Sequence, residues 1–173
     1  MTKILILYAS KHGSTAEVAA YLADVLRKQN IAVDVTNAAE FTKDVLDYDA
    51  VIIGTGIYHG LWLNPLWYTV RRLSEQLAKI PVWGFALCVR VLEEDGDIHT
   101  WKHYMPHTVL QEINLQVFKF FGGRLLDLTP NEISTFSERY DGQYLHRRGD
   151  FRDWDAIHQY GKEIATALSP VTA

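Results

Sequence analysis

The sequence has little of several features that would assign a protein to a class at once. Only one of its 173 residues is a cysteine, Cys88, so a disulfide framework is excluded and a reducing, cytoplasmic location is expected. Its 17 lysines and arginines are outnumbered by 21 aspartates and glutamates, and a net charge of -4 gives no support for binding nucleic acid. No run approaches the roughly 20 apolar residues of a transmembrane helix. Peripheral contact with the inner face of a membrane stays open.

Several catalytic and nucleotide-binding motifs are also missing. The chain lacks the G-x-x-x-x-G-K-[ST] motif of nucleotidases and the G-x-S-x-G motif of serine hydrolases. Gly54, Gly56 and Gly60 are spaced G-x-G-x-x-x-G, one residue longer than the dinucleotide-binding motif and after the wrong strand. A phospho-receiver domain would need acidic residues where the sequence reads LYAS and IIGTG. These classes are therefore excluded.

The sequence does contain an alternation of apolar runs and amphipathic segments. The predicted strands are residues 3–8, 31–35, 50–54, 81–89 and 117–128, the last broken by Gly122-Gly123. The predicted helices are residues 16–29, a helix that begins at Asn64-Pro65, part of 100–113 with an interruption at Pro106, and 154–168. Buried strands that alternate with helices predict an α/β fold, with a parallel sheet covered on both faces. We expect a single domain over residues 1–173.

The loop at residues 9–15 joins the first predicted strand to the first predicted helix. A helix N-terminus offers free N–H groups and a partial positive charge, which suit a phosphate, and Gly13 allows close backbone approach. The candidate phosphate ligands are Ser10, Lys11, His12, Gly13, Ser14 and Thr15. The alternative is a plain helix cap, because Ser14 and Glu17 fit a capping box. Position and composition leave both interpretations open.

The third predicted strand runs into a loop of glycines and aromatic residues, GTGIYHGLW, at residues 54–62. Glycines let the backbone approach a flat ring, and Tyr58 or Trp62 could cover its faces. Tyr58 is the better candidate because it lies between Gly56 and Gly60. Loops after parallel strands meet at one edge of the sheet, so the two loops together predict a planar phosphorylated cofactor. Flavin mononucleotide (FMN) fits that description.

Four blocks of sequence resemble a known family and occur in its order: ILYASKHGSTAEVA, YDAVIIGTGIYHG, FFGGRL and GDFRDWDAIHQYGKEIA. The first is similar to the flavodoxin-like superfamily, and the other three are similar to its menaquinone-dependent protoporphyrinogen IX dehydrogenase group. The resemblance implies a three-layer α/β/α sandwich with a five-stranded parallel sheet. It also implies an FMN-dependent oxidoreductase of heme biosynthesis, which passes electrons from protoporphyrinogen IX to a quinone.

The same resemblance assigns the phosphate to residues 10–15 and the flavin ring to two further loops. The ring-binding residues that it implies are Thr55, Gly56, Ile57, Tyr58, His59, Gly60, Cys88, Val89 and Arg90. No catalytic side chain is expected, since the cofactor carries the chemistry. Residues 125–150 are shorter and, in their first half, more acidic than the dehydrogenases' insertion. A small electron carrier without its own substrate is therefore the alternative, and a cofactor-free binding module is the third.

Three further clusters have weaker interpretations. His99, His103 and His107 are spaced four apart, as metal ligands on a helix can be, but Pro106 interrupts the helix, so surface histidines are favoured. The acidic run at residues 93–97 is interpreted as a solvated turn or as a face for a basic redox partner. A basic cluster in the long polar segment could bind propionates or balance local acids. Its residues are Arg139, His146, Arg147 and Arg148.

Overall fold

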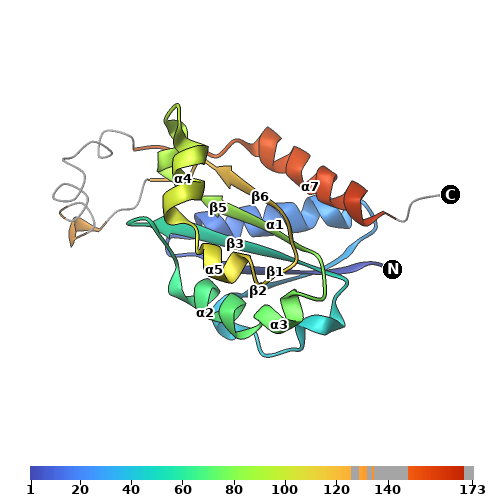
Figure 1. Ribbon diagram of the computed structural model, residues 1–173. Coiled ribbons are helices and arrows are strands. Elements are labelled where there is room, and N and C mark those ends of the chain that lie inside the picture. Colours follow the sequence, from blue (N-terminus) through green and yellow to red (C-terminus); the bar gives the residue numbers. More distant parts are fainter. Residues whose placement is uncertain (126–128, 132–133, 135–147, 170–173) are drawn as a thin grey trace.

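Five parallel strands lie at the centre of the molecule, in the spatial order β2-β1-β3-β5-β6 (Figure 1). The computed structural model describes residues 1–125, 129–131, 134 and 148–169. The strands are β1 (Lys3–Ala9), β2 (Ala32–Asn37), β3 (Ala50–Tyr58), β5 (Val82–Leu87) and β6 (Leu115–Phe121). The predicted α/β fold with a five-stranded parallel sheet is confirmed. The strand order reverses between β1 and β3, where open α/β sheets bind ligands.

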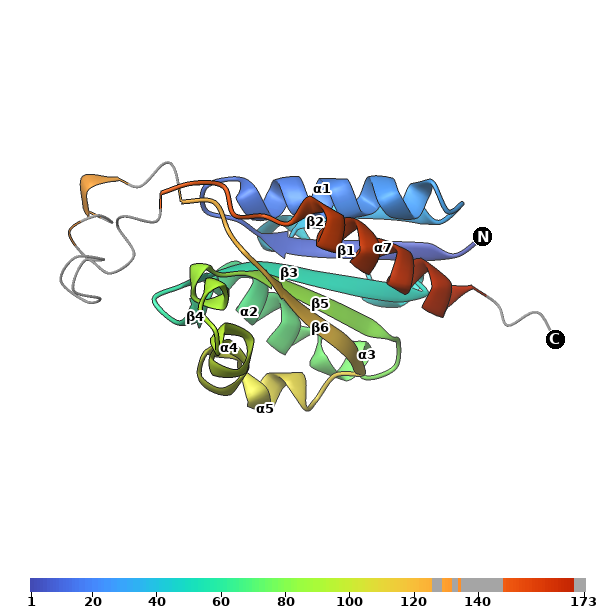
Figure 2. The same cartoon turned by 90° about the horizontal axis from the view of Figure 1, so that it is seen from above.

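Helices cover both faces of this sheet, as Figure 2 shows: α1 and α7 lie on one face, and α2 to α5 lie on the other. Their bounds are α1 (Ser14–Arg27), α2 (Asn64–Arg72), α3 (Ser74–Leu77), α4 (Gly96–Tyr104), α5 (His107–Leu110) and α7 (Trp154–Leu168). The last helix has the predicted bounds, and Pro106 interrupts the helical segment between α4 and α5 as expected. The three-layer arrangement is therefore present.

Each face of the sheet has its own apolar core, and alternation along β1 explains why. Ile4 and Ile6 belong to the core beneath α1 and α7, while Leu5 and Leu7 belong to the core on the opposite face. Successive side chains of a strand point to opposite faces, so a continuous apolar run serves both cores. All four side chains are fully buried.

Several predicted boundaries differ from the structure. Helix α1 begins at Ser14, two residues earlier than predicted, because Gly13 is its N-cap in the left-handed conformation at φ 86°. Ser14 is thus the first helical residue, and the predicted capping box is wrong. Leu63 is the N-cap of α2, so the prediction that Asn64 caps this helix is wrong. Pro65 lies in the first turn, as predicted. Strand β3 extends to Tyr58, four residues beyond its predicted end at Gly54.

Two strands at the borders of the sheet also refine the prediction. The short strand β4 (Leu61–Trp62) pairs antiparallel with the end of β3, and periodicity could not reveal an element of this length. The edge strand β6 ends at Phe121, just before Gly122-Gly123.

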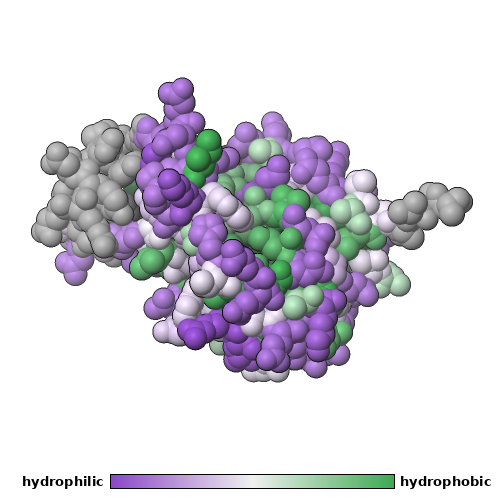
Figure 3. All heavy atoms as spheres, in the orientation of Figure 1, coloured by the Kyte–Doolittle hydropathy of each residue, from purple (hydrophilic) through white to green (hydrophobic). Residues whose placement is uncertain are grey.

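Figure 3 shows hydrophobic residues gathered in the middle of one face, between α4, α5 and α7. None of the helices in the described ranges is long and apolar enough to cross a membrane.

Candidate functional site

The loops that follow β1 and β3 begin side by side at one edge of the sheet. Ala9 at the end of β1 pairs with Thr55 of β3, and Thr55 in turn pairs with Ala86 of β5. The third predicted loop, after β5, therefore starts at the same edge. This edge holds the carboxyl ends of the strands, where the sequence predicts the cofactor.

The segment from the end of β1 into the first turn of α1, which we call the phosphate loop (residues 10–15), is the predicted phosphate site. Gly13 adopts φ 86°, a conformation that costs an L side chain roughly 1–2 kcal/mol. Ser14 and Thr15 are buried in the first turn of α1. The Oγ atom of Ser10 is also buried, and it has no hydrogen-bond partner among the residues that the structure describes. A buried hydroxyl without a partner is costly unless a ligand completes it.

The β3–β4 hairpin packs directly against the phosphate loop. The Nζ atom of Lys11 lies 5.4 Å from the centre of the Tyr58 ring, and the His12 ring lies 6.1 Å from the same ring. The Thr15 hydroxyl would lie 3.6 Å from a Cβ atom added at Gly56. The structure therefore brings together residues of the two predicted loops that are 40 positions or more apart in the sequence.

Internal contacts hold the hairpin in shape. The buried Thr55 hydroxyl donates to the carbonyl oxygen of Gly56 at 2.9 Å and accepts from the Leu63 N–H at 3.2 Å. A Cβ atom at Gly56 would lie 2.8 Å from the Tyr58 ring, so the ring needs glycine there. His59 and Gly60 both adopt positive φ at the tip, at 51° and 76°. The side chain of Thr55 thus shapes the loop, which leaves the backbone at 56–60 as the candidate ring contact.

The third loop, after β5, forms a 3₁₀ helix over Val89–Leu92 and is tied to α4. Arg90 Nη2 donates to Asp95 Oδ1 at 2.6 Å, and this hydrogen bond lowers the pKa of Asp95. Cys88 is buried, and burial raises the pKa of its thiol. A neutral, buried thiol fits the default interpretation of Cys88 as a packing residue.

A set of charged residues, which we call the arginine clasp, holds the phosphate loop from the other side. The clasp consists of Glu17, Arg124, Asp150 and Arg152. Arg152 bonds to Glu17 at 2.7 Å and to Asp150 at 2.5 Å, and Arg124 bonds to the second oxygen of Glu17 at 3.0 Å. Arg124 also donates to the carbonyl oxygen of His12 at 3.2 Å. The clasp therefore joins α1 to two segments that lie more than 100 residues further along the chain.

The clasp is a network of ion pairs that share partners, built around an arginine side chain that is almost fully buried. The side chain of Arg152 is only 4% exposed, and its guanidinium lies 4.7 Å above the Trp154 ring. Hydrogen bonds from Arg152 lower the pKa of both Glu17 and Asp150, and those bonds raise the pKa of Arg152 itself. Glu17, Asp150 and Arg152 are therefore held in their charged forms. Two cations and two anions balance one another, so the clasp fixes the position of the phosphate loop without adding net charge to it.

Glu17 does not form the capping box that its place in the sequence predicts, and its part in the clasp was not predicted. Instead of bonding back to the helix start, Glu17 accepts hydrogen bonds from both arginines. The only indication in the sequence was that Arg124 and Arg152 lie in the blocks FFGGRL and GDFRDWD, which carry the family resemblance.

The weaker clusters do not form a metal site in the described ranges. The His99 and His103 rings lie 4.6 Å apart, but the His107 ring packs against Trp101 instead. Within those ranges, no group of three or more His, Cys, Asp or Glu side chains could hold a metal ion. Residues 93–95 of the acidic run form a turn before α4, as predicted, and Asp97 lies in the first turn of that helix. Of the predicted basic cluster, Arg139, His146 and Arg147 lie outside the described residues, and Arg148 is exposed.

Comparisons with known proteins agree with this architecture. The model of the flavodoxin domain family matches residues 5–129. Protoporphyrinogen IX dehydrogenase (quinone) of Escherichia coli K12 is 32% identical over 80 residues, which are 46% of this chain and 44% of that protein. The match thus spans less than half the length of that curated relative.

Solved structures match over nearly the whole chain at low identity. Oxidised flavodoxin 1 from Bacillus cereus superposes with a TM-score of 0.61 at 17% identity and covers 97% of this chain and 100% of its own. A flavodoxin of Streptococcus pneumoniae TIGR4 gives a TM-score of 0.63, also at 17% identity, and covers 96% and 100%. At this level of identity the likeness concerns the fold.

Proposed function

The chain belongs to the flavodoxin domain family, and we propose that it is an FMN-dependent oxidoreductase. The observation that carries the proposal is the buried Ser10 hydroxyl beside the N-terminus of α1, which has no hydrogen-bond partner within the described part of the chain. A phosphate oxygen at this point would complete the hydrogen bonding of Ser10 and meet the free N–H groups of the first helical turn. The FMN phosphate supplies such an oxygen.

The residues present fit FMN at both ends of the proposed site. Ser10, Ser14 and Thr15 would hold the phosphate together with the backbone of residues 11–13, and the arginine clasp would hold this loop in position. The backbone of Gly56–Gly60 would lie along the edge of the flavin ring, with Tyr58 as its aromatic cover. Cys88, Val89 and Arg90 would border the ring from the third loop. When bound, FMN would supply one- and two-electron transfer, while the protein fixes its position and environment.

For the reaction, we propose electron transfer from a reduced organic substrate to a quinone-type acceptor. The support is the partial match to protoporphyrinogen IX dehydrogenase (quinone). The name of that relative gives a quinone as its electron acceptor. A porphyrinogen is accordingly the first substrate to test. A flavodoxin-type electron carrier is the second candidate, because solved flavodoxins match nearly the whole chain whereas the dehydrogenase matches less than half.

The first experiment is the absorption spectrum of the purified protein, before and after incubation with FMN and desalting. We expect retained flavin bands. The variant Ser10→Ala should leave the unliganded protein equally stable or slightly more stable, because it removes an unpartnered hydroxyl. The same variant should weaken FMN binding by about tenfold, close to the net value of one charge-assisted hydrogen bond.

A conservative pair of variants provides the control. Thr15→Ser keeps the hydroxyl and should bind FMN nearly as the natural protein does, while Thr15→Val should bind it more weakly. Protein that stays colourless with excess FMN would contradict the proposal. Turnover then separates the two functions: an enzyme shows saturable oxidation of protoporphyrinogen IX with a quinone present, whereas a carrier shows reduction of a partner protein alone.

A further inference from the structure

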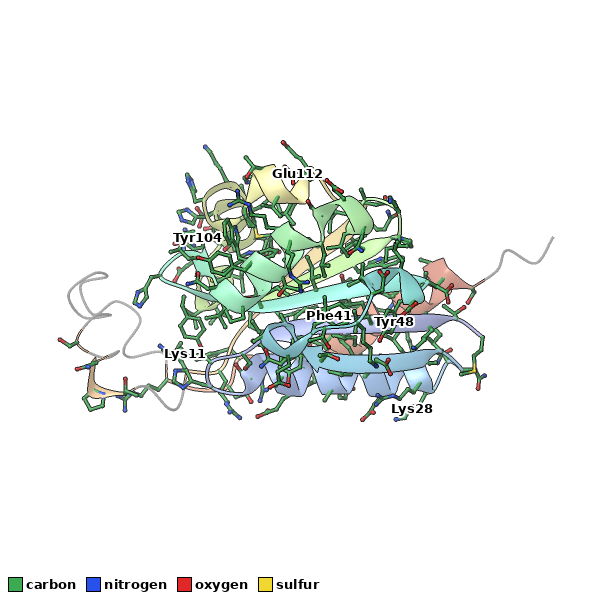
Figure 4. The ribbon with its side chains drawn as sticks, turned by 90° about the horizontal axis from the view of Figure 1, so that it is seen from below. Lys11, Lys28, Phe41, Tyr48, Tyr104 and Glu112 are labelled. Atoms are coloured by element: carbon green, nitrogen blue, oxygen red, sulfur yellow. The ribbon has the colours of Figure 1, made fainter. Side chains whose placement is uncertain are left out.

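The β3–β4 hairpin borders a second feature, a groove on its side away from the phosphate loop. The groove has a volume of about 280 Å³ and is lined by Gly60–Trp62, by Asn64, Trp67 and Tyr68 of α2, and by residues 103–106. Tyr104 lies against the hairpin tip, since a Cβ atom at Gly60 would be 3.0 Å from its ring. Figure 4 shows Tyr104 and Lys11 on opposite sides of the hairpin.

The lining of this groove is aromatic and carries no fixed charge. Trp62, Trp67, Tyr68 and Tyr104 supply four rings, and none of the lining residues is Asp, Glu, Lys or Arg. Apolar side chains remain exposed at its rim, where Leu61 is 68% and Tyr68 is 62% exposed. Such a surface favours a flat, uncharged ring over a ligand with carboxylates.

One lining residue, Trp62, also carries a buried polar atom. Trp62 is only 5% exposed, and its indole Nε1 is buried without a hydrogen-bond partner among the described residues. One face of this indole stacks on Phe118, at 5.6 Å between ring centres, so packing fixes its orientation. An indole N–H is a donor only, so the partner that it lacks is an acceptor such as a carbonyl oxygen.

The groove and the proposed flavin site share the β3–β4 hairpin. Trp62 of β4 pairs with Ile57 of β3, so the indole and the backbone that we assign to the flavin ring lie on the two strands of one hairpin. A ligand in the groove would therefore lie against the same hairpin as the flavin. A volume of about 280 Å³ is near the lower limit of small-molecule sites and suits one or two fused rings rather than a tetrapyrrole.

We propose that this groove binds the ring of a quinone acceptor, with a quinone carbonyl accepting from Trp62 Nε1. The proposal rests on the proposed function, because the quinone gains two electrons and two protons to become a quinol, and reduced FMN loses the same two electrons and two protons. No further reagent is needed for that balance.

The test is a titration of FMN-loaded, ¹⁵N-labelled protein with menadione, followed through the tryptophan indole N–H signals. The chain has 5 tryptophans, and Trp62→Phe identifies the signal of interest by its loss. We expect a saturable downfield shift of the Trp62 signal as its N–H gains an acceptor, while the Trp101 signal, from outside the groove, stays in place. No Trp62 shift, or equal shifts of all indoles, would overturn the proposal.

Affinities from calorimetry provide the second readout. Trp62→Phe keeps the ring and removes the donor, so menadione should bind about tenfold more weakly, which corresponds to roughly 1.4 kcal/mol. Trp67→Ala opens one wall and should weaken binding at least threefold. Trp101→Phe, the matched control, should bind as the natural protein does. Unchanged affinity in both groove variants would place menadione elsewhere and overturn the proposal.

Two further outcomes are separable. If the Trp62 signal shifts with protein concentration in the absence of menadione, a second copy of the chain covers the groove, and the proposal fails. FMN retention is measured on the same samples by absorption. If the natural protein does not retain FMN, the proposed function is refuted. The indole titration reports on the groove whether or not flavin is bound.

Discussion

The two sides of the β3–β4 hairpin are built from opposite kinds of side chain. On one side, the arginine clasp supports the phosphate loop through ion pairs from Arg152 and Arg124 to Glu17 at 2.7 and 3.0 Å. On the other side, the groove is walled by aromatic rings and has no fixed charge in its lining. Both regions use residues distant in sequence, but one uses charge to hold them together and the other uses packing.

This difference matches the ligands that we propose for each side. A phosphate is anionic, so a site for it benefits from the free N–H groups of a helix N-terminus, which the clasp holds in position. A quinone ring is neutral, and its site gains from apolar contact with a single donor. The two regions should therefore respond differently to changes in packing, charge and pH.

The tightest packing on the clasp side is at Gly122, just after β6. A Cβ atom there would lie 2.2 Å from the carbonyl oxygen of Phe151, whereas at Gly123 the nearest atom would be 3.8 Å away. Gly122→Ala must move backbone that leads into Arg152, so we expect it to lower the free energy of unfolding by about 2–3 kcal/mol. Gly123→Ala, the matched control, should change it by less than about 1 kcal/mol. Chemical denaturation measures both, and equal effects would contradict the packing argument.

Removal of the central arginine should have the next largest effect. Arg152→Ala leaves Glu17 and Asp150 without their main partner and uncovers the Trp154 ring. We expect a loss of about 2 kcal/mol in the free energy of unfolding, below the roughly 3–5 kcal/mol of fully buried pairs because both carboxylates are partly exposed.

The control for Arg152 is an exposed ion pair elsewhere in the molecule. Lys43 lies 3.6 Å from Asp34, and its side chain is 66% exposed. Lys43→Ala should cost about 0.5 kcal/mol or less, as exposed pairs do. Similar losses for Arg152→Ala and Lys43→Ala in chemical denaturation would show that the clasp is an ordinary surface cluster.

The pH dependence of stability should also come from the clasp side. Hydrogen bonds from Arg152 lower the pKa of Glu17 and Asp150 in the folded protein. The unfolded chain takes up protons near the ordinary carboxyl values of about 4, so it binds more protons than the folded protein just below that pH. The stability that these two carboxylates contribute is fully present above the ordinary carboxyl pKa. It is lost as the pH falls through the lowered pKa values of the folded protein.

Glu17→Gln tests this sign directly. Between about pH 5 and pH 3, the free energy of unfolding should fall less steeply for this variant than for the natural protein. Glu112→Gln, at an exposed position after α5, is the matched control for replacing one carboxylate by an amide. The measurement is urea denaturation at several pH values. Parallel curves for Glu17→Gln and the natural protein would remove Glu17 from the pH-sensitive network.

The same contrast explains what the sequence could predict. The strands and α7 follow from apolar runs and helical periodicity, which depend on residues close together in the chain. The arginine clasp depends on pairs such as Glu17 with Arg124, and nothing local marks such a pair. The first helix shows the consequence, since Glu17 fits a local capping box yet bonds to distant arginines. The residues assigned to FMN stay predictions, although the phosphate loop and the hairpin lie together.

The smallest effect concerns two helix starts, one on each side of the hairpin. Asn64, at the groove, is a residue type that favours the N-cap position, but the N-cap of α2 is Leu63. Within the described part of the chain, no side chain makes a capping hydrogen bond to this helix start. Asp153, beside the clasp, is the N-cap of α7 and accepts from the Ala156 N–H at 2.9 Å. Asp153→Ala should cost about 1 kcal/mol in the free energy of unfolding, and Asn64→Ala less than about 0.5 kcal/mol. Thermal and urea denaturation of the two variants would measure this difference. If Asn64→Ala proved the more costly change, Asn64 would cap α2 in solution, and the groove wall would owe its position to a polar contact as well as to packing.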